Sequence, residues 1–335
     1  MRILIVAFAL LYPSLAHAGF EEAARYNADN RGISMLVMVD GEIVFEDYPN
    51  GGSSHQANNL ASGTKSFSGI IAAAMVQDGL LDLDERVSDT IHQWRGNRRG
   101  DDRENITVRQ LLSLTDGLDH RGRMARPPTY ARAITSQPEH RPGTVFTYHP
   151  APFQIFGELV QRKLNGESPL AYLERRIFDP IGLEYGDWKH GRDGNPHLPS
   201  GASITARNWA TFGQFILQNG AWEGEQLVDR HAFAELFMGS SVNPAYGITW
   251  WLNEPVDATY ARRTSPMAQA TDFWQDPDAF PDDLVLAAGA GNQRLYISWE
   301  ENLVVVRQAD GVLRGLLSRR NDWSDVEFFR LLMDN

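Results

Sequence analysis

Lysine is scarce in this sequence, and one of its three copies follows a serine at a spacing that could support nucleophilic chemistry. Of the 31 basic residues, three are lysines, at Lys65, Lys163 and Lys189, so arginine is the default cation. Lys65 stands three residues after Ser62 in NNLASGTKSF, just before a strongly apolar run. A lysine amine can lose its proton inside a protein, whereas an arginine guanidinium cannot. The lysine at position 65 therefore suggests a group that works in its neutral form.

A serine and a lysine three residues apart on a helix share one face. If Ser62 stands in the first turn of a buried helix, its backbone N–H has no intrahelical partner and could face a developing oxyanion. Burial would lower the pKa of Lys65, and the neutral amine could then accept the Ser62 proton. The structural alternative is that Ser62 caps a helix and Lys65 lies at the surface.

Several other chemistries are excluded by the residues present. SGTKS lacks the Gly-Lys adjacency and the earlier glycine of a phosphate-binding loop. The sequence has no Gly-x-Ser-x-Gly elbow, which argues against an α/β-hydrolase, and no cysteine, which excludes disulfides and thiolate chemistry. The histidines show no His-Glu-x-x-His spacing. We expect neither a metal nor a cofactor.

Composition indicates an ordinary globular protein. The chain has 335 residues, of which 42% are hydrophobic and 22% charged, and its net charge is −12. This charge argues against a nucleic-acid partner, which would require a basic face, and against adhesion to anionic lipid. The sequence does not indicate an oligomeric state.

The N-terminal segment is typical of a secretory signal peptide. Residues 1–18 combine a basic Arg2, an apolar stretch and small residues at Ala16 and Ala18, so we expect cleavage after Ala18. We therefore expect a periplasmic or secreted protein. No other segment is long and apolar enough to span a membrane, so no membrane insertion is expected after signal removal.

Strand patterns lie near both ends of the chain. Asp40-Gly41 separates two Val- and Ile-rich runs in ISMLVMVDGEIVFEDY and predicts a tight hairpin. After it, SFSGIIAAAMVQDG predicts a helix buried at the centre of the domain and ending at Gly79. Further strands are predicted in YGITWWL, LVLAAGAG, QRLYISW and NLVVVRQ, before a final helix in WSDVEFFRLLM.

These patterns predict an α+β fold with one antiparallel sheet built from N- and C-terminal segments and flanked by helices. We expect residues 19–85 and 245–335 to form an α/β subdomain and residues 86–244 an inserted, mainly helical one, together one catalytic domain. Residues 257–283 hold several Pro, Asp and Ala without periodicity, and a segment of that length could be a lid over the cleft.

Two further segments carry residues that could do chemistry. In GTVFTYHPAPFQIFGELVQRKL, Tyr148 precedes an apolar helix, and in LVLAAGAGNQRLYISWEENLVVV a small-residue strand leads into two others. With the Ser62–Lys65 segment they resemble, in order, the three motifs of the serine β-lactamase and penicillin-binding-protein superfamily. The sequence is most similar to the branch of class C β-lactamases, esterases and 6-aminohexanoate-dimer hydrolases. Supporting phrases are ITVRQLLSLTDGLD, SGASITARNWATFGQFILQNGAWEGEQLV and YGITWWL.

This resemblance implies roles for individual residues. Ser62 would be the nucleophile, Lys65 its base partner, and Tyr148 the residue that relays protons to the leaving group. The oxyanion hole would use the N–H groups of Ser62 and Ala290, with the third motif at Ala287-Ala288-Gly289. The structural alternatives are that Tyr148 caps a helix and that the small residues allow close strand packing.

The chain also departs from the family pattern. The second motif has Pro150, after His149, where a polar group usually stands two places after the tyrosine, and the third motif begins with Ala287 in place of Lys or His. Without that cation, which helps hold a substrate carboxylate, a neutral ester or amide is a more suitable substrate than an anionic β-lactam. Arg294 is near in sequence, and Arg294 and Gly289 are candidate substrate-binding residues.

Four aromatic residues are further candidates for the substrate pocket, although tryptophans in strands are more often core residues. They are Tyr246, Trp250, Trp251 and Trp274. The sequence thus predicts an exported serine hydrolase acting on a small-molecule ester, amide or peptide through an acyl-enzyme. The alternatives are a β-lactamase or D-Ala-D-Ala peptidase, and a catalytically silent binding protein of the same fold.

Overall fold

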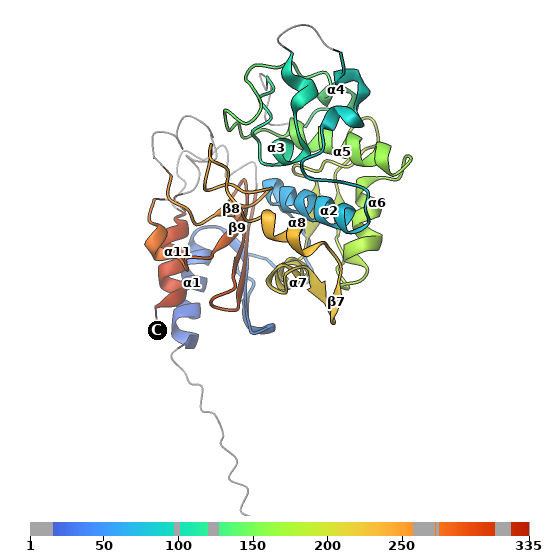
Figure 1. Ribbon diagram of the computed structural model, residues 1–335. Helices are drawn as coiled ribbons and strands as arrows, with labels where there is room; N and C mark the ends of the chain where they lie inside the picture. The colour runs from blue at the N-terminus through green and yellow to red at the C-terminus, as the bar shows by residue number, and fades with distance from the viewer. Residues whose placement is uncertain are drawn as a thin grey trace, which may run out of the picture.

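The centre of the fold is a six-stranded antiparallel sheet in the order β2-β1-β11-β10-β9-β8 (Figure 1). The structure is a computed structural model that describes residues 16–96, 101–119, 127–256, 272, 275–311 and 323–334. The strands are β1 (Gly32–Val39), β2 (Glu42–Asp47), β8 (Trp251–Leu252), β9 (Val285–Gly289), β10 (Gln293–Ser298) and β11 (Leu303–Ala309). Segments from the two ends of the sequence therefore meet in one sheet, which confirms the α+β prediction.

Helices and shorter strands make up the rest of the described structure. The helices of the described residues include α1 (Ala16–Asp29), α2 (Ser66–Gln77), α3 (Val108–Leu112), α4 (Tyr130–Ala133), α5 (Ala151–Lys163), α6 (Pro169–Leu173), α7 (Ala206–Leu217), α8 (Arg230–Glu235), α11 (Asp325–Met333) and the 3₁₀ turn η1 (Ala61–Lys65). A three-stranded sheet joins β3 (Asn58–Asn59), β5 (Ala202–Ile204) and β4 (Asp187–Trp188), and a small hairpin joins β6 (Ala221–Trp222) to β7 (Glu225–Gln226). None of the described helices combines the length and the apolar character needed to cross a bilayer.

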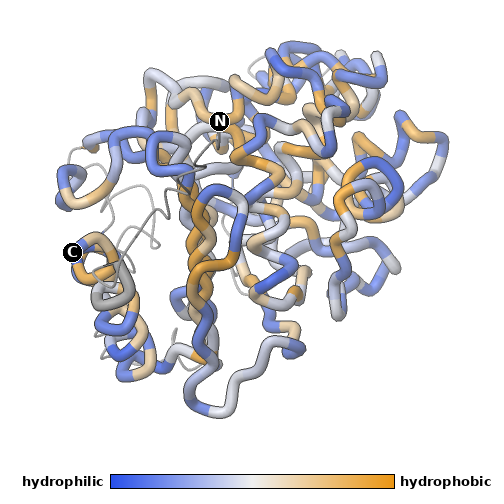
Figure 2. The backbone as a smooth tube through the Cα atoms, turned by 90° about the horizontal axis from the view of Figure 1, so that it is seen from below, coloured by the Kyte–Doolittle hydropathy of each residue, from blue (hydrophilic) through white to orange (hydrophobic). Residues whose placement is uncertain are grey.

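Helices cover both faces of the large sheet. Figure 2 shows the hydrophobic strands between the α1–α11 pair on one side and the remaining helices on the other, where α7 packs on β10 and β11. All residues of β10 and β11 are therefore buried. This two-sided cover explains why their sequences read as nearly continuous apolar runs and not as an alternating pattern. The edge strand β2 is partly exposed along its length.

The turn between β1 and β2 follows from two residues. Asp40 and Gly41 have φ values of 51° and 82°, the left-handed pair that a type I′ hairpin turn requires. The Asn302 side chain donates a hydrogen bond to Asp40 Oδ1 at 2.9 Å and so links this turn to the residue that precedes β11. The predicted hairpin is confirmed.

The predicted central helix is also confirmed. Every α2 residue from Ser66 to Met75 is buried, as expected for a helix that is apolar nearly all round. The helix ends at Gln77, and Gly79 has a φ of 69° just beyond it. The Leu80 N–H reaches back to the Met75 carbonyl at 2.8 Å, the pattern of a glycine-terminated helix.

The run YGITWWL forms much less strand than predicted. Thr249 takes a φ of 73°, and the Gly247 N–H donates to the Trp250 carbonyl at 2.9 Å, so the chain turns sharply before β8. The apolar residues are needed for the core and not for a long strand, a distinction that a short hydrophobic run does not reveal.

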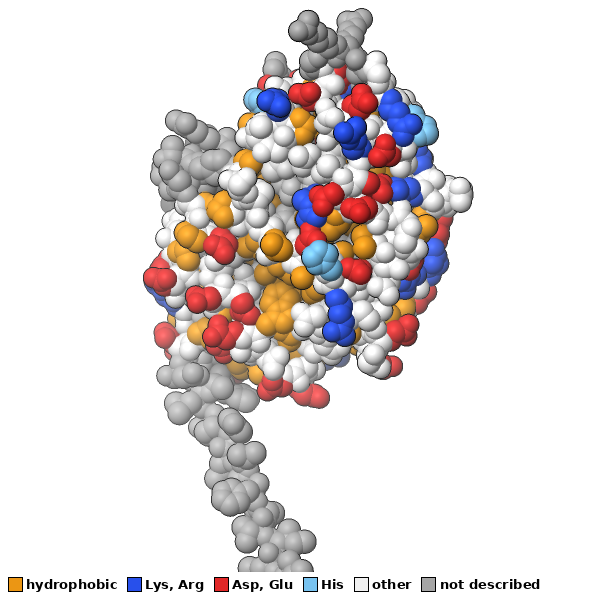
Figure 3. All heavy atoms as spheres, viewed as in Figure 1, with side chains coloured by type: hydrophobic (Ala, Val, Ile, Leu, Met, Phe, Trp, Pro, Cys, Tyr) orange, Lys and Arg blue, Asp and Glu red, His pale blue; other side chains and the backbone are white. Residues whose placement is uncertain are grey.

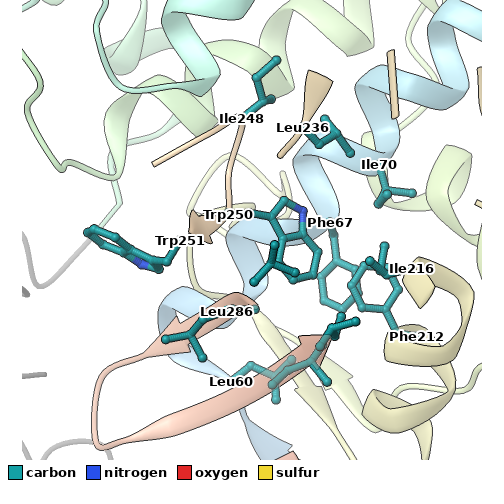
Figure 4. Close-up of a cluster of buried hydrophobic side chains, with 14 of the residues drawn as sticks. Leu60, Phe67, Ile70, Phe212, Ile216, Leu236, Ile248, Trp250, Trp251 and Leu286 are labelled. Atoms are coloured by element: carbon teal, nitrogen blue, oxygen red, sulfur yellow. The ribbon is translucent and has the colours of Figure 1, made fainter. Parts of the chain in front are cut away.

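Trp250 belongs to the core. Its side chain is fully buried, its ring stacks on Phe212 with 6.2 Å between centroids, and it lies 5.6 Å from Phe237. Figure 4 shows it among apolar side chains from α2, α7 and β9. Trp250 was predicted as a substrate-binding candidate, and this part of the prediction is wrong because the ring fills the space between helices and sheet.

Truncation of Trp250 should therefore act on stability. We expect Trp250→Ala to lower the free energy of unfolding by about 3–5 kcal/mol, because it leaves a large cavity in a close-packed core. Urea denaturation followed by circular dichroism would measure the change. Met238→Ala, at a side chain that is 65% exposed, is the control and should change stability by less than about 0.5 kcal/mol. A loss below about 1 kcal/mol in the tryptophan variant would contradict this assignment.

Candidate active site

Ser62 and Lys65 are brought together by the short turn η1. Lys65 Nζ donates a hydrogen bond to Ser62 Oγ at 2.9 Å. In a 3₁₀ turn, side chains three residues apart are eclipsed, so Ser62 and Lys65 project from the same side of the turn. Ala61, directly before the serine, has a φ of 47°, which is uncommon for a non-glycine residue and indicates backbone strain at this point. The structure therefore places the predicted Ser62–Lys65 pair in hydrogen-bond contact.

Lys65 is a buried amine whose described contacts include no carboxylate. Its side chain is buried, and its described acceptors are Ser62 Oγ and the Pro199 carbonyl, the latter at 3.0 Å. The rings of Tyr148 and Phe153 lie 4.8 and 5.3 Å from Nζ. Burial lowers the pKa of Lys65 to about 7, since a charged amine without a carboxylate is poorly solvated there. A large fraction of the amine is therefore neutral at physiological pH and can accept a proton.

The Pro199 carbonyl was not predicted from the sequence. It lies in the irregular segment before β5, and Lys65 Nζ donates to its backbone oxygen. A backbone acceptor carries no residue-type signal, so no pattern in the sequence could have indicated it. This carbonyl orients the amine without adding a negative charge that would raise its pKa.

Tyr148 completes the group around Ser62. Its side chain is buried, and its hydroxyl is hydrogen-bonded to the Ser62 side chain. Burial raises the pKa of Tyr148, and the smaller opposing effects of the Ser62 hydrogen bond and the Arg294 charge do not offset it. The phenol is therefore protonated at neutral pH. It can relay a proton but does not act as a resident phenolate base.

An aromatic cluster holds the Tyr148 ring. Trp251 stacks on it with 5.5 Å between centroids, and Tyr246 meets it edge-on at 6.1 Å. Phe146 packs against both Tyr246 and Trp251. Tyr246 and Trp251 were predicted to bind substrate; the structure places both beside the site, where they fix the orientation of Tyr148. Contact with substrate stays a prediction for these two residues.

The third motif lies against the turn η1, which carries Ser62. A Cβ atom built on Gly289 would stand 2.0 Å from the Leu60 carbonyl oxygen, so only glycine allows β9 to approach η1 this closely. The next residue, Ala290, is half-buried at the start of the turn into β10. Within the described part of the chain, the Ser62 N–H has no hydrogen-bond acceptor. This arrangement is compatible with an oxyanion hole of the Ser62 and Ala290 N–H groups, which stays a prediction.

Arg294 does not face the site directly, and its prediction as a substrate-binding residue is wrong. Its side chain is 1% exposed, and its guanidinium forms a bidentate ion pair with Asp325 of α11 at 2.7 and 3.1 Å. Strand alternation turns Arg294 to the α11 face of the sheet, away from the face that carries η1.

The remaining aromatic candidate, Trp274, and residues 257–271 and 273 of the predicted lid lie outside the described residues.

The departures from the family pattern have structural counterparts. His149 is buried, and its Nδ1 accepts a hydrogen bond from the Ala151 N–H at 3.1 Å, so it caps the start of α5. Ala287 is buried in β9 and places a methyl group where a cation usually begins the motif.

No group of acidic, histidine or cysteine side chains suited to a metal ion occurs in the described ranges.

Comparison with known proteins identifies the family. The beta-lactamase family model matches residues 19–311. The chain belongs to the beta-lactamase family. Among curated proteins it is similar to protein flp of Staphylococcus aureus strain MRSA252, with 24% identity over 183 residues. That match covers 50% of this chain and 36% of the relative, so the chain corresponds to little more than a third of the relative's length.

Solved structures of the family share the fold. A 6-aminohexanoate-dimer hydrolase homologue from Bacillus anthracis superposes with a TM-score of 0.69 at 18% identity, covering 86% of this chain and 76% of that one. A penicillin-binding-protein homologue from Caulobacter crescentus gives 0.68 at 16% identity and 96% coverage of both chains. EstCE1, a hydrolase with promiscuous acyltransferase activity, gives 0.64 at 14% identity, with 95% and 97% coverage. These similarities confirm the β-lactamase-like fold predicted from the sequence.

The low pKa of Lys65 can be measured directly, because the chain has three lysines. We expect one lysine Nζ signal of the ¹⁵N-lysine-labelled protein to titrate near pH 7, where burial places the pKa of Lys65. Lys65→Met removes one signal and so assigns it. If the signal that is lost in Lys65→Met titrates near the ordinary lysine value of about 10.4, a neutral Lys65 is contradicted.

Proposed function

We propose that this chain is an exported serine hydrolase that cleaves a neutral ester or amide through an acyl-enzyme. The observation that carries the proposal is the pair formed by Ser62 and Lys65. Nζ lies 2.9 Å from the serine oxygen, and burial lowers the pKa of Lys65 to about 7. A base poised near neutral pH, within hydrogen-bond distance of a partly exposed hydroxyl, is the requirement for nucleophilic catalysis by serine.

In the acylation step, Ser62 Oγ attacks the substrate carbonyl carbon and its proton passes to the neutral amine of Lys65. The carbonyl oxygen becomes an oxyanion, which the N–H groups of Ser62 and Ala290 stabilise. When the tetrahedral intermediate collapses, the bond to the leaving alcohol or amine breaks. Tyr148, protonated and hydrogen-bonded to the Ser62 side chain, delivers a proton to that leaving group and regains one from the Lys65 ammonium.

Deacylation repeats these roles with water as the nucleophile. The Lys65–Tyr148 pair takes a proton from the water that attacks the acyl carbon, and the same N–H groups stabilise the second oxyanion. Breaking the ester bond to Ser62 Oγ releases the acid and returns the proton to the serine. The buried aromatic cluster around Tyr148 keeps the relay rigid through both steps.

A neutral substrate fits the charges around the site. The position that opens the third motif is Ala287, and the nearby Arg294 is committed to Asp325 on the other face of the sheet. In the described residues, the cation that touches Ser62 is Lys65, which the mechanism needs in its neutral form. A substrate carboxylate would therefore lack the countercharge that favours its burial. The similarity in fold to an amide hydrolase homologue and to EstCE1 supports an ester or amide.

Export is part of the proposal. It is supported by the signal-like order of Arg2, an apolar stretch, Ala16 and Ala18 at the N-terminus. In the structure α1 begins at Ala16 and so includes the expected cleavage point after Ala18. Mass spectrometry of the protein secreted from a bacterial host would show an N-terminus at Gly19 if cleavage occurs there.

Replacement of the nucleophile tests the mechanism. We expect Ser62→Ala to lower p-nitrophenyl butyrate hydrolysis by about 10⁴-fold or more, because the acyl-enzyme cannot form. Ser68→Ala, in the adjoining helix α2, is a matched control. Its hydroxyl is buried and has no described hydrogen-bond partner, so activity should be retained. Equal rates for wild type and Ser62→Ala would refute the proposed nucleophile. Absence of turnover and of a fluorophosphonate adduct in the wild type would favour the silent binding protein.

The preference for neutral substrates is tested against an anionic β-lactam. We expect kcat/KM for p-nitrophenyl butyrate to exceed that for nitrocefin by at least about 10-fold, because a carboxylate without a countercharge loses more than about 1.4 kcal/mol of binding. Fluorescent penicillin should label the protein weakly. Nitrocefin turnover that matches or exceeds ester turnover would support the β-lactamase alternative.

A further inference from the structure

Two buried arginines stand side by side behind the third motif. Arg294 of β10 and Arg307 of β11 are direct partners in the antiparallel register, so both side chains project from the same face of the sheet. Their exposed fractions are 1% and 0%. Burying two like charges next to each other is unfavourable unless each is compensated by specific contacts.

Both guanidiniums donate to the turn that joins β9 to β10. Arg294 Nη1 donates to the carbonyl oxygens of Gly289 and Gln293, each at 3.1 Å. Arg307 Nη1 donates to the carbonyl oxygen of Asn292 at 2.6 Å. The backbone on either side of Ala290 is thus fixed by side chains from behind the strand.

The arginines are themselves anchored in the α1–α11 layer. Asp325, the first residue of α11, holds Arg294 and also accepts hydrogen bonds from Tyr296 Oη at 2.5 Å and Trp323 Nε1 at 3.1 Å. Arg307 Nε donates to Asn27 Oδ1 at 2.9 Å, and its guanidinium lies 3.9 Å from the centre of the Trp323 ring. These contacts leave neither guanidinium free to move.

The geometry of the peptide bond means that fixing the Gly289 carbonyl also fixes the direction of the Ala290 N–H. In a trans peptide the C=O of one residue and the N–H of the next point in opposite directions. Because the Gly289 carbonyl points to Arg294, the N–H of Ala290 points away from it. A Cβ atom on Gly289 would meet Leu60, the residue directly before η1. Arg294 pairs with Ala288, one residue along from Gly289, so its side chain lies on the other face of the sheet.

We infer that Arg294 and Arg307 are positioning residues that hold the Ala290 N–H in the oxyanion hole. This arginine clamp, the two side chains with Asp325, orients the donor without contact with substrate. The inference rests on the proposed function, since it assigns a purpose to the clamp in acyl transfer. It also gives the layer formed by α1 and α11 a role in catalysis beyond covering the sheet.

Arg294→Lys tests the clamp, with Tyr296→Phe as the matched control. Lysine keeps the charge opposite Asp325 but cannot reach the carboxylate and the Gly289 carbonyl together. Tyr296→Phe removes another hydrogen bond to the same carboxylate without touching the turn. The readouts are kcat and KM for p-nitrophenyl butyrate, thermal stability, and the inhibition constant of phenylboronic acid, whose serine adduct places an oxygen in the oxyanion hole.

For Arg294→Lys we expect kcat to fall by about 10- to 100-fold with little change in KM, because a misplaced oxyanion donor acts on the transition state. Phenylboronic acid should bind more weakly by a similar factor. Tyr296→Phe should lose comparable stability but keep kcat within about 3-fold. If Arg294→Lys is poorly folded, Arg307→Lys, which leaves the Arg294–Asp325 pair intact, should show the same pattern by releasing the Asn292 carbonyl.

The outcomes separate this inference from the proposed function. Wild-type values of kcat and boronate affinity in Arg294→Lys and Arg307→Lys would overturn the clamp alone. Losses in Tyr296→Phe as large as those in the arginine variants would also overturn it, because general destabilisation would then explain them. A wild type that neither hydrolyses the ester nor binds the boronate would overturn the proposed function, and the clamp with it.

Discussion

The burial of Lys65 beside Ser62 is the constraint on which the rest of the site depends. A buried ammonium is costly, and the described contacts of this one are a hydroxyl, a backbone carbonyl and two aromatic rings. Burial therefore lowers the pKa of Lys65 to about 7. The surroundings of Lys65 preserve this low pKa. The helix α2 is buried, Tyr148 remains protonated, and the amine is held by a backbone carbonyl and not by a carboxylate.

The construction of the sheet explains how the site is assembled. β9 and β10 come from the C-terminal part of the chain, yet they pack against η1 from the N-terminal part, so the candidate site depends on contacts between distant segments. The contact between Gly289 and Leu60 is close enough to require glycine. The two faces of the sheet then have different tasks. One face lies against the turn η1 that carries Ser62, and the other holds charged side chains that fix the backbone of the third motif.

The buried charges of this protein are accordingly arranged in two ways. Among the described residues no carboxylate pairs with Lys65, so its amine can lose a proton, whereas Arg294 is paired with Asp325 and stays charged and fixed. The choice of residue type matches these tasks. Lysine is a single point charge whose pKa responds to burial, and arginine is a planar fork that binds a carboxylate and a carbonyl together.

Local pattern determined much of this protein. The Asp40-Gly41 hairpin, the buried α2 helix, the three C-terminal strands and the Ser62–Lys65 pair are all readable from the sequence, because each depends on turn chemistry, periodicity or spacing within a few residues. Tertiary structure decided which way side chains face. Alternation on β10 sends Arg294 behind the sheet, and the turn at Thr249 sends Trp250 into the core. Likewise, the acceptor for Lys65 is a backbone carbonyl from residue 199, which carries no side-chain signal. Such choices depend on what packs against each face, and that information lies in distant parts of the chain.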